Sequence, residues 1–168
     1  MSYDKITVVI NTFNSEDKIQ QCLKSINPNV KVIIIENSNN LNFKNVVEKK
    51  HSNVNCFLAG QNLGYAKGNN FGLSKVKSDY ALILNPDAFL IKGTLERLLV
   101  IANNFKDFSI IGPARQNEYV KLDLHKNKED TFEVNRLKGF AMFLNIKQLQ
   151  EIGFFDEKFF IYLEEIDL

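Results

Sequence analysis

Apolar residues in the first half of the chain gather in four short continuous runs, at residues 6–10, 30–35, 54–59 and 80–84. Each run has the length of a strand, and polar residues follow it. The segments between the runs carry apolar residues at helical spacing. Strands that are apolar on both faces and alternate with helices predict a parallel sheet covered on both sides. The expected fold class is therefore α/β and Rossmann-like, with a mostly parallel central sheet.

The helical segments carry start signals that suggest where each helix begins. We expect a helix after the first run with Asn14 or Ser15 as its N-cap, and a helix over residues 94–104 with Thr94 as its N-cap. Their expected core-facing residues are Ile19, Cys22, Leu23 and Ile26 in the first, and Leu95, Leu98, Leu99 and Ala102 in the second. Two further helices are expected at residues 43–51 and 65–76.

The last third of the chain is less regular. Residues 115–136 hold much of the mixed charge and show little periodicity, which favours a short strand followed by a mobile loop. The elements expected in this third are strands at residues 109–112, 119–124 and 140–146, and a helix at residues 147–152 that ends at Gly153. We find no internal repeat and no linker, so one domain over residues 1–168 is expected.

Composition narrows the classes of function. The 21 Lys and Arg residues nearly balance the 20 Asp and Glu residues, and no basic run indicates a nucleic-acid-binding surface. Cys22 and Cys56 lack the spacing of metal ligands and fall on a predicted helix and strand, which favours reduced core thiols. No apolar run reaches the ~20 residues that span a bilayer. The cytosol is the expected location, with peripheral membrane contact left open.

The tripeptide Asn85-Pro86-Asp87 follows the fourth predicted strand. It is also a common turn sequence, because proline and asparagine or aspartate suit the positions of a turn. Right-handed crossovers, however, place the loops that follow parallel strands along one edge of the sheet, where ligands bind. A carboxylate there is well placed to hold a divalent cation against a diphosphate. One aspartate, phosphate oxygens and water complete an octahedral Mg or Mn site.

Two more polar segments are expected at the same edge. The carboxylate of Glu36, in Glu36-Asn37-Ser38, either accepts a hydrogen bond from a uracil or thymine imide or is a solvated strand end. Residues 62–70 enter a helix with glycines that allow close backbone approach and with amide groups that can bind a ligand. This segment lacks the Gly-Lys-Ser/Thr ending of a P-loop, and the loop after the first strand lacks the glycines of a dinucleotide fingerprint.

Three carboxylates, Glu164, Glu165 and Asp167, lie close together near the end of the chain. Adjacent helical residues point about 100° apart, so Glu164 and Glu165 diverge on a helix, whereas Glu164 and Asp167 share a face. A solvated acidic helix start is the alternative interpretation. The aromatic residues that precede this turn favour burial of its entry instead.

Taken in order, these segments resemble glycosyltransferase family 2, especially its rhamnosyltransferase-like branch. The matching segments are the first strand and base-binding loop at residues 8–14, the second strand at 32–38, the Asn-Leu-Gly and Gly-Asn-Asn segment at 62–70, the metal motif at 84–88, and the acceptor-side segments at 138–142 and 152–162. The resemblance implies a GT-A type fold and a nucleoside diphosphate sugar donor, linked to UDP or dTDP. It also implies a divalent metal, Mn or Mg, and inversion at the anomeric carbon.

The same resemblance implies roles for particular residues. Asp87 would bind the metal, and Glu165 of the acidic pair, with Glu164 beside it, would remove the proton of the acceptor hydroxyl. The donor is expected to contact Thr12, Asn14, Glu36, Asn37, Ser38, Asn62, Gly64, Asn69 and Asn85. Residues 1–112 would form the donor-binding half, and 113–168 the start of the acceptor-side half. The expected acceptor is a glycan or a lipid-linked glycan in cell-surface polysaccharide synthesis, and a homodimer is left open.

The chain departs from the family pattern in three places. Glu36 and Glu165 stand where aspartate is usual, and family members continue past the acidic pair whereas this chain ends at Leu168. We therefore expect donor binding with weak or absent transfer, and an inactive nucleotide-sugar-binding domain is the first alternative. A sugar nucleotidyltransferase is less favoured, because residues 11–15 lack a Gly-rich loop with Arg or Lys to handle a triphosphate.

Overall fold

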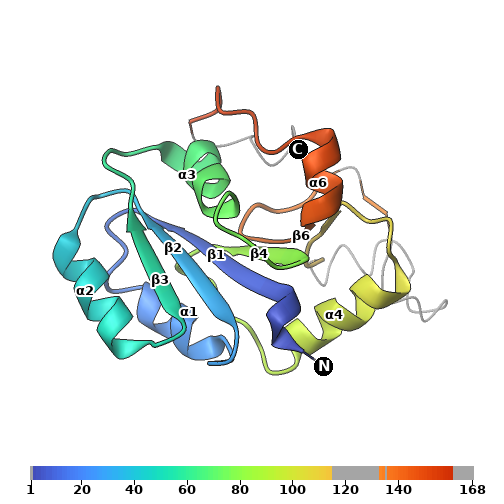
Figure 1. Ribbon diagram of the computed structural model, residues 1–168, viewed down its shortest axis with the longest axis horizontal. Helices are drawn as coiled ribbons and strands as arrows, with labels where there is room; N and C mark the ends of the chain where they lie inside the picture. The colour runs from blue at the N-terminus through green and yellow to red at the C-terminus, as the bar shows by residue number, and fades with distance from the viewer. Residues whose placement is uncertain (1, 115–132, 135, 161–168) are drawn as a thin grey trace.

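The computed structural model describes residues 2–114, 133–134 and 136–160, and Figure 1 shows their arrangement. A six-stranded sheet runs through the centre in the order β3-β2-β1-β4-β6-β5. The strands are β1 (Ile6–Thr12), β2 (Lys31–Glu36), β3 (Val54–Leu58), β4 (Tyr80–Leu84), β5 (Ile110–Ile111) and β6 (Ala141–Asn145). The first four are parallel to one another, and β6 pairs antiparallel with both β4 and β5. The mostly parallel sheet is thus confirmed.

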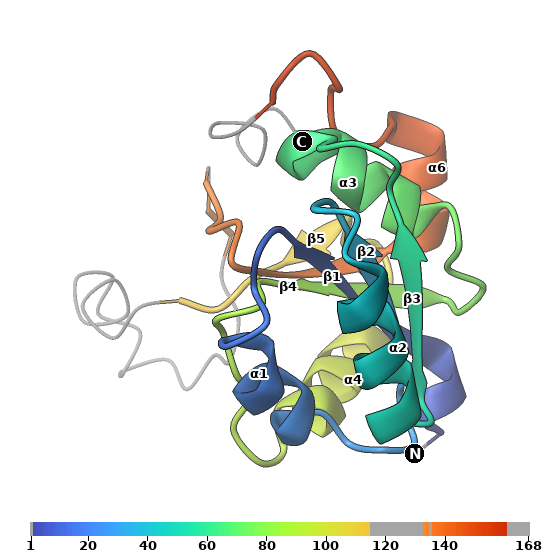
Figure 2. The same cartoon turned by 90° about the vertical axis from the view of Figure 1, so that its left-hand side faces the viewer.

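Helices cover both faces of the sheet, as expected from strands that are apolar on both sides. Figure 2 shows α1 (Ile19–Ser25), α2 (Leu41–Lys50) and α4 (Thr94–Asn104) on one side, and α3 (Gly64–Leu73) and α6 (Ile146–Ile152) on the other. The alternation of β1 shows the division: Val8 and Ile10 pack with the first group, and Val9 packs with the second. The side chains of Val8, Val9 and Ile10 are all fully buried. The described helices include none that is long and apolar enough to cross a membrane.

Two predicted N-caps are wrong. A turn whose Ser15 carbonyl accepts the N–H groups of Lys18 and Ile19 precedes α1, so Lys18, and neither Asn14 nor Ser15, stands at the cap. At α4 the cap is Gly93, in the left-handed region at φ 90°, and Thr94 is the first helical residue. The Thr94 hydroxyl donates back to the carbonyl of Ile91, which satisfies it outside the helix.

Other element bounds differ by a few residues. Helix α2 begins at Leu41, earlier than predicted, because the Asn40 side chain accepts the N–H of Phe43 and caps it. Helix α3 ends at Leu73 rather than 76, and the strand expected at 109–112 is reduced to Ile110–Ile111. Helix α6 begins at Ile146, capped by Asn145. The strand and mobile loop predicted within 115–136 lie almost entirely outside the described residues.

Candidate functional site

The ends of β1 and β2 meet at one edge of the sheet. Thr12 and Glu36 are register partners, and the N–H of Asn37 donates to the Thr12 carbonyl at 2.9 Å. Because β4 is parallel to β1 and pairs with it, the turn after Leu84 starts from the same edge. The sequence prediction that the polar segments after these strands share one edge is therefore confirmed.

The carboxylate of Glu36 holds the loop that follows β2. It accepts the N–H and the hydroxyl of Ser38 through one oxygen, and the N–H of Asn40 at 2.6 Å through the other. Only 2% of the residue is exposed, so the interpretation as a solvated strand end is wrong. Hydrogen bonds from the loop compensate the burial of this charge. Glu36 thereby joins the end of β2 to the start of α2.

The loop after β1 is tied to the loop after β2. Thr12 is buried, and its hydroxyl donates to the carbonyl of Ile35 at 3.2 Å. Asn14 is exposed in the left-handed region at φ 48°, and its N–H donates to the Ser38 hydroxyl at 3.4 Å. Because Asn14 is exposed, its carboxamide is open to a ligand. The hydroxyl of Thr12, in contrast, is buried and bonded within the sheet.

A pair of carboxamides joins this edge to the start of α3. The Asn37 side chain donates to the Asn11 carboxamide oxygen, and the Asn37 oxygen accepts the N–H of Leu63 at 3.0 Å. The Asn11 carboxamide nitrogen donates to the carbonyls of Gly64 and Tyr65 at 2.9 and 3.2 Å. Asn11 was not among the predicted site residues. The signal for it was an asparagine directly after the apolar residues Val8, Val9 and Ile10, near the end of β1.

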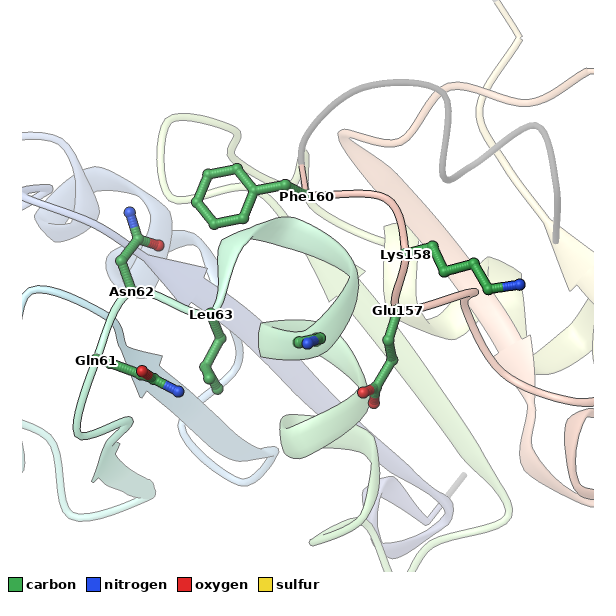
Figure 3. A pocket seen from close by; sticks show the side chains of 7 residues that line it. Gln61, Asn62, Leu63, Glu157, Lys158 and Phe160 are labelled. Atoms are coloured by element: carbon green, nitrogen blue, oxygen red, sulfur yellow. The ribbon is translucent and has the colours of Figure 1, made fainter.

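The entry to α3 is shaped by Asn62 and Gly64. The exposed Asn62 side chain accepts the N–H of Gly64 at 3.0 Å, and Gly64 adopts φ 74°. The N–H of Tyr65 donates to the Phe160 carbonyl at 2.8 Å, which brings the segment after α6 against this entry. Figure 3 shows that segment beside α3, and between them lies a cleft of about 260 Å³. Its lining residues are Gln61, Asn62, Leu63, Lys67, Glu157, Lys158 and Phe160.

The carboxamides of Asn69 and Asn70 in α3 differ at the nitrogen, which has partners in Asn70 alone, whereas neither oxygen has a partner among the described residues. Asn70 donates to the Phe155 carbonyl at 2.9 Å and to the Glu157 carboxylate at 3.2 Å. Asn69 is fully buried, and within the described part of the chain neither polar atom of its carboxamide has a hydrogen-bond partner. A buried amide without a partner costs about 1–3 kcal/mol unless water or a ligand satisfies it. Asn69 is therefore available to a buried water or a bound molecule.

The turn after β4 carries the predicted metal ligand. The N–H of Asn85 donates to the Phe140 carbonyl, and the carbonyl of Asn85 accepts the N–H of Ala88. Asp87 is exposed on this turn.

The thiol of Cys22 in α1 contacts the same turn, with its Sγ 3.7 Å from the Asn85 carbonyl oxygen. Burial first, and the Asp87 charge second, raise the pKa of the Cys22 thiol to about 12. Both cysteines are free and buried, as predicted.

The described residues contain no group of three His, Cys, Asp or Glu side chains placed to hold a metal by themselves. A single exposed carboxylate still fits Mg or Mn when a diphosphate and water supply the other oxygens, because both metals prefer hard oxygen ligands. Asp87 is thus compatible with a metal that is bound together with a diphosphate.

The predicted carboxylates Glu164, Glu165 and Asp167 lie outside the described residues. Of the aromatic residues before them, Phe155 is buried, whereas Phe154 and Phe160 are exposed.

Sequence comparison identifies the family. The chain belongs to Glycosyl transferase family 2, whose pattern matches residues 7–167. It is 25% identical over 187 residues to the low-salt glycan biosynthesis hexosyltransferase Agl10 of Haloferax volcanii, an alignment that covers 98% of this chain and 60% of that protein. It is 27% identical over 106 residues to an uncharacterized glycosyltransferase of Haemophilus influenzae, with 59% of this chain and 42% of that protein covered.

Solved structures show the same fold. TarS 1–349 of S. aureus superposes with a TM-score of 0.76 at 18% identity, over 96% of this chain and 53% of that one. The mannosyltransferase PcManGT of Pyrobaculum calidifontis, solved with GDP-Man and Mn²⁺, superposes with a TM-score of 0.76 at 14% identity, over 91% and 48%. The chain is a glycosyltransferase domain of the GT-A fold. It spans about half of these structures and 60% of the Haloferax protein.

Proposed function

We propose that this domain binds a UDP- or dTDP-linked sugar at the carboxyl edge of its sheet and transfers the sugar, with inversion, to a glycan acceptor. The observation that carries the proposal is the meeting of three loops, after β1, after β2 and before α3, at the edge where the Asp87 turn also begins. Structures of the similar TarS 1–349 contain UDP and UDP-GlcNAc, and that of PcManGT contains GDP-Man, which supports a nucleotide-sugar donor.

The donor-binding residues divide into two groups by their exposure. Asn14 and Asn62 are exposed and present carboxamides to solvent, so we propose that they contact the nucleotide directly. Thr12 and Glu36 are committed to hydrogen bonds inside the protein and act by holding the loops. Asn37 is buried and belongs with Thr12 and Glu36, because its side chain is bonded to Asn11 and Leu63. Ser38, Gly64, Asn69 and Asn85 complete the proposed donor site. Residues 1–112 would then form the donor-binding half, and 113–168 the beginning of the acceptor-side half.

Asp87 is the residue that would hold a divalent metal. The metal would neutralise charge on the diphosphate as it leaves, which is the usual contribution of a bound cation to such a reaction. Asp87 would fix its place at the sheet edge, and the backbone around Asn85 holds the turn through its bonds to Phe140 and Ala88. An exposed carboxylate is suited to this task, since the phosphates and water must reach the same cation.

The proposed chemistry is a single displacement. The acceptor hydroxyl oxygen forms a bond to the anomeric carbon while the bond from that carbon to the diphosphate breaks. We propose that Glu165 takes the proton of the hydroxyl, with Glu164 directed elsewhere, because adjacent helical residues diverge. The diphosphate leaves with the electron pair. Binding geometry and exclusion of water are separate requirements for this step, and the acceptor-side half would supply them.

The proposed setting is cell-surface polysaccharide synthesis on the cytosolic side of a membrane. A lipid-linked glycan acceptor would bring the protein into peripheral contact with that membrane.

The test is transfer by a chain extended to the length of its relatives, measured with a panel of nucleotide sugars. Glu165→Gln should lower turnover ~100-fold or more, the scale of a general base, with donor affinity nearly unchanged. Glu164→Gln is the matched control. If Glu164→Gln produced the loss and Glu165→Gln did not, the two roles would have to be exchanged. Donor binding without transfer by any extended form would favour a binding domain instead, and formation of a sugar nucleotide from a triphosphate would favour a nucleotidyltransferase.

A further inference from the structure

We infer that the Asn11–Asn37 carboxamide pair positions the donor-binding loop before α3, so that both are positioning residues for nucleotide binding. The inference rests on the proposed function. Neither side chain needs to touch the nucleotide, because each acts through backbone groups of the α3 entry.

The pair closes a ring of hydrogen bonds across three segments. Asn37 accepts the N–H of Leu63 and donates to Asn11, and Asn11 donates to the carbonyls of Gly64 and Tyr65. Asn37 is 4% exposed, so its bonds are shielded from water. A carboxamide both donates and accepts, and this is why the pair can bind an N–H group and two carbonyls of one turn at the same time.

The packing of α3 against Asn11 leaves no room for a side chain at residue 68. Gly68 lies on the Asn11 carboxamide, and a Cβ at that position would overlap both polar atoms of the Asn11 side chain. One turn further along α3, Gly72 approaches the Val9 side chain in the same way. The helix therefore packs close to β1 along one line. The Asn11 side chain fills the space beneath Gly68 and reaches the start of the helix.

The peptide group between Gly64 and Tyr65 is held from two sides. The Asn11 carboxamide donates to the Gly64 carbonyl on one side of this peptide group. On the other side, the Tyr65 N–H donates to the Phe160 carbonyl. The Asn62 side chain, which we propose contacts the donor, accepts the N–H of Gly64 in the same turn. A shift of this turn would therefore move a proposed donor ligand and the segment around Phe160 together. Preorganisation of this kind raises affinity by reducing the ordering that binding requires.

Asn53 provides a control carboxamide away from the pair. It donates to the Val30 carbonyl at 2.8 Å and joins β2 and β3 at the opposite end of the sheet. Asn53→Ala removes a bond of the same kind at a place far from the proposed donor site. It should lower the melting temperature without changing nucleotide affinity.

The test measures UDP affinity by calorimetry, at a temperature where every variant is folded. Wild-type protein is measured first with UDP and with dTDP, and absence of binding of both nucleotides would contradict the proposed function rather than this inference. Given wild-type binding, Asn11→Ala and Asn37→Ala should each weaken affinity about tenfold, the effect of losing one to two net hydrogen bonds of preorganisation. Asn53→Ala should leave the affinity within about twofold. Equal affinity in all four proteins would overturn the inference.

A double-mutant cycle separates positioning from general destabilisation. Gly68→Ala should weaken UDP binding in the wild-type background, because the new Cβ displaces the Asn11 carboxamide. In the Asn11→Ala background the added methyl has room, so Gly68→Ala should have little further effect. Hydrogen exchange of the Leu63 backbone amide should also be faster in Asn37→Ala, because the Asn37 oxygen that accepts this N–H is lost. Additive effects of Gly68→Ala and Asn11→Ala on affinity would contradict the proposed positioning role.

Discussion

The N–H of Tyr65 donates to the carbonyl of Phe160 at 2.8 Å, and this bond docks the segment after α6 against the start of α3. The contact requires glycine at position 64, because a Cβ there would overlap the Phe160 carbonyl and ring. Gly64 also adopts φ 74°, a conformation that other residues rarely take. The close approach of the two segments thus depends on one missing side chain.

Gly64→Ala should lower the melting temperature by about 5–10 °C. Alanine is strained in the left-handed backbone conformation, and its Cβ would overlap Phe160. Gly60→Ala is the matched control, since Gly60 has φ 81° and no atom within 4 Å of an added Cβ. It should cost roughly 1 kcal/mol, or about 2–4 °C. Thermal unfolding followed by circular dichroism compares the two variants. Equal shifts would show that the Phe160 contact does not constrain position 64.

Glu36→Gln should lower the free energy of unfolding by about 3 kcal/mol. The amide keeps the shape of the side chain but replaces one acceptor oxygen by an NH₂ group, which would face the N–H of Asn40 or the donors of Ser38. Glu16→Gln is the control, because the carboxylate of the exposed Glu16 accepts a hydrogen bond from the Asn40 side chain. Urea titration of both variants measures the difference. A loss as small as that of Glu16→Gln would contradict the loop-holding role of Glu36.

Asn69 and Asn70 offer a comparison between neighbours. Asn69→Leu removes an amide without a described partner and should leave the melting temperature unchanged or higher, while it weakens nucleotide binding. Asn70→Leu removes the bonds to Phe155 and Glu157 and should destabilise the fold by about 1–3 kcal/mol. Thermal unfolding with and without UDP measures both properties. Strong destabilisation by Asn69→Leu would show that its amide is satisfied within the folded protein.

The buried thiols predict a loss of stability at high pH. Burial is the largest cause that raises the pKa of both the Cys22 and the Cys56 thiol from the ordinary value of 9.0 to about 12. Between these values the unfolded chain ionises its thiols while the folded chain keeps them protonated, so the unfolded state binds fewer protons and stability falls as pH rises. Urea titrations between pH 8 and about 10.5 measure the slope. Replacing both cysteines by alanine should reduce it, and an unchanged slope would contradict buried, protonated thiols.

The alternation of apolar runs and helices predicted the four parallel strands, because continuous burial on both faces leaves a clear pattern in the sequence. It could not predict that Glu36 is buried, since that burial depends on Ser38 and Asn40 folding back onto the carboxylate. Nor could it show Asn11 as part of the site. Its partners Gly64 and Tyr65 are far along the chain, and the contact depends on how closely α3 packs on β1 at Gly68. The N-caps of α1 and α4 were misplaced because turns at Ser15 and Gly93 compete with helix start signals.

Metal-dependent nucleotide binding tests the central claim most directly. Calorimetric titration of UDP or dTDP should show tight binding in the presence of Mn²⁺ or Mg²⁺ and weaker binding with a chelator. A ligand at 100 times its dissociation constant should stabilise the fold by ~2.7 kcal/mol, or several degrees in melting temperature. Asp87→Asn should abolish the metal-dependent part of binding. Asp79→Asn, an exposed aspartate just before the other end of β4, should retain it. Binding of neither nucleotide, or metal-dependent binding that survives Asp87→Asn, would contradict the account.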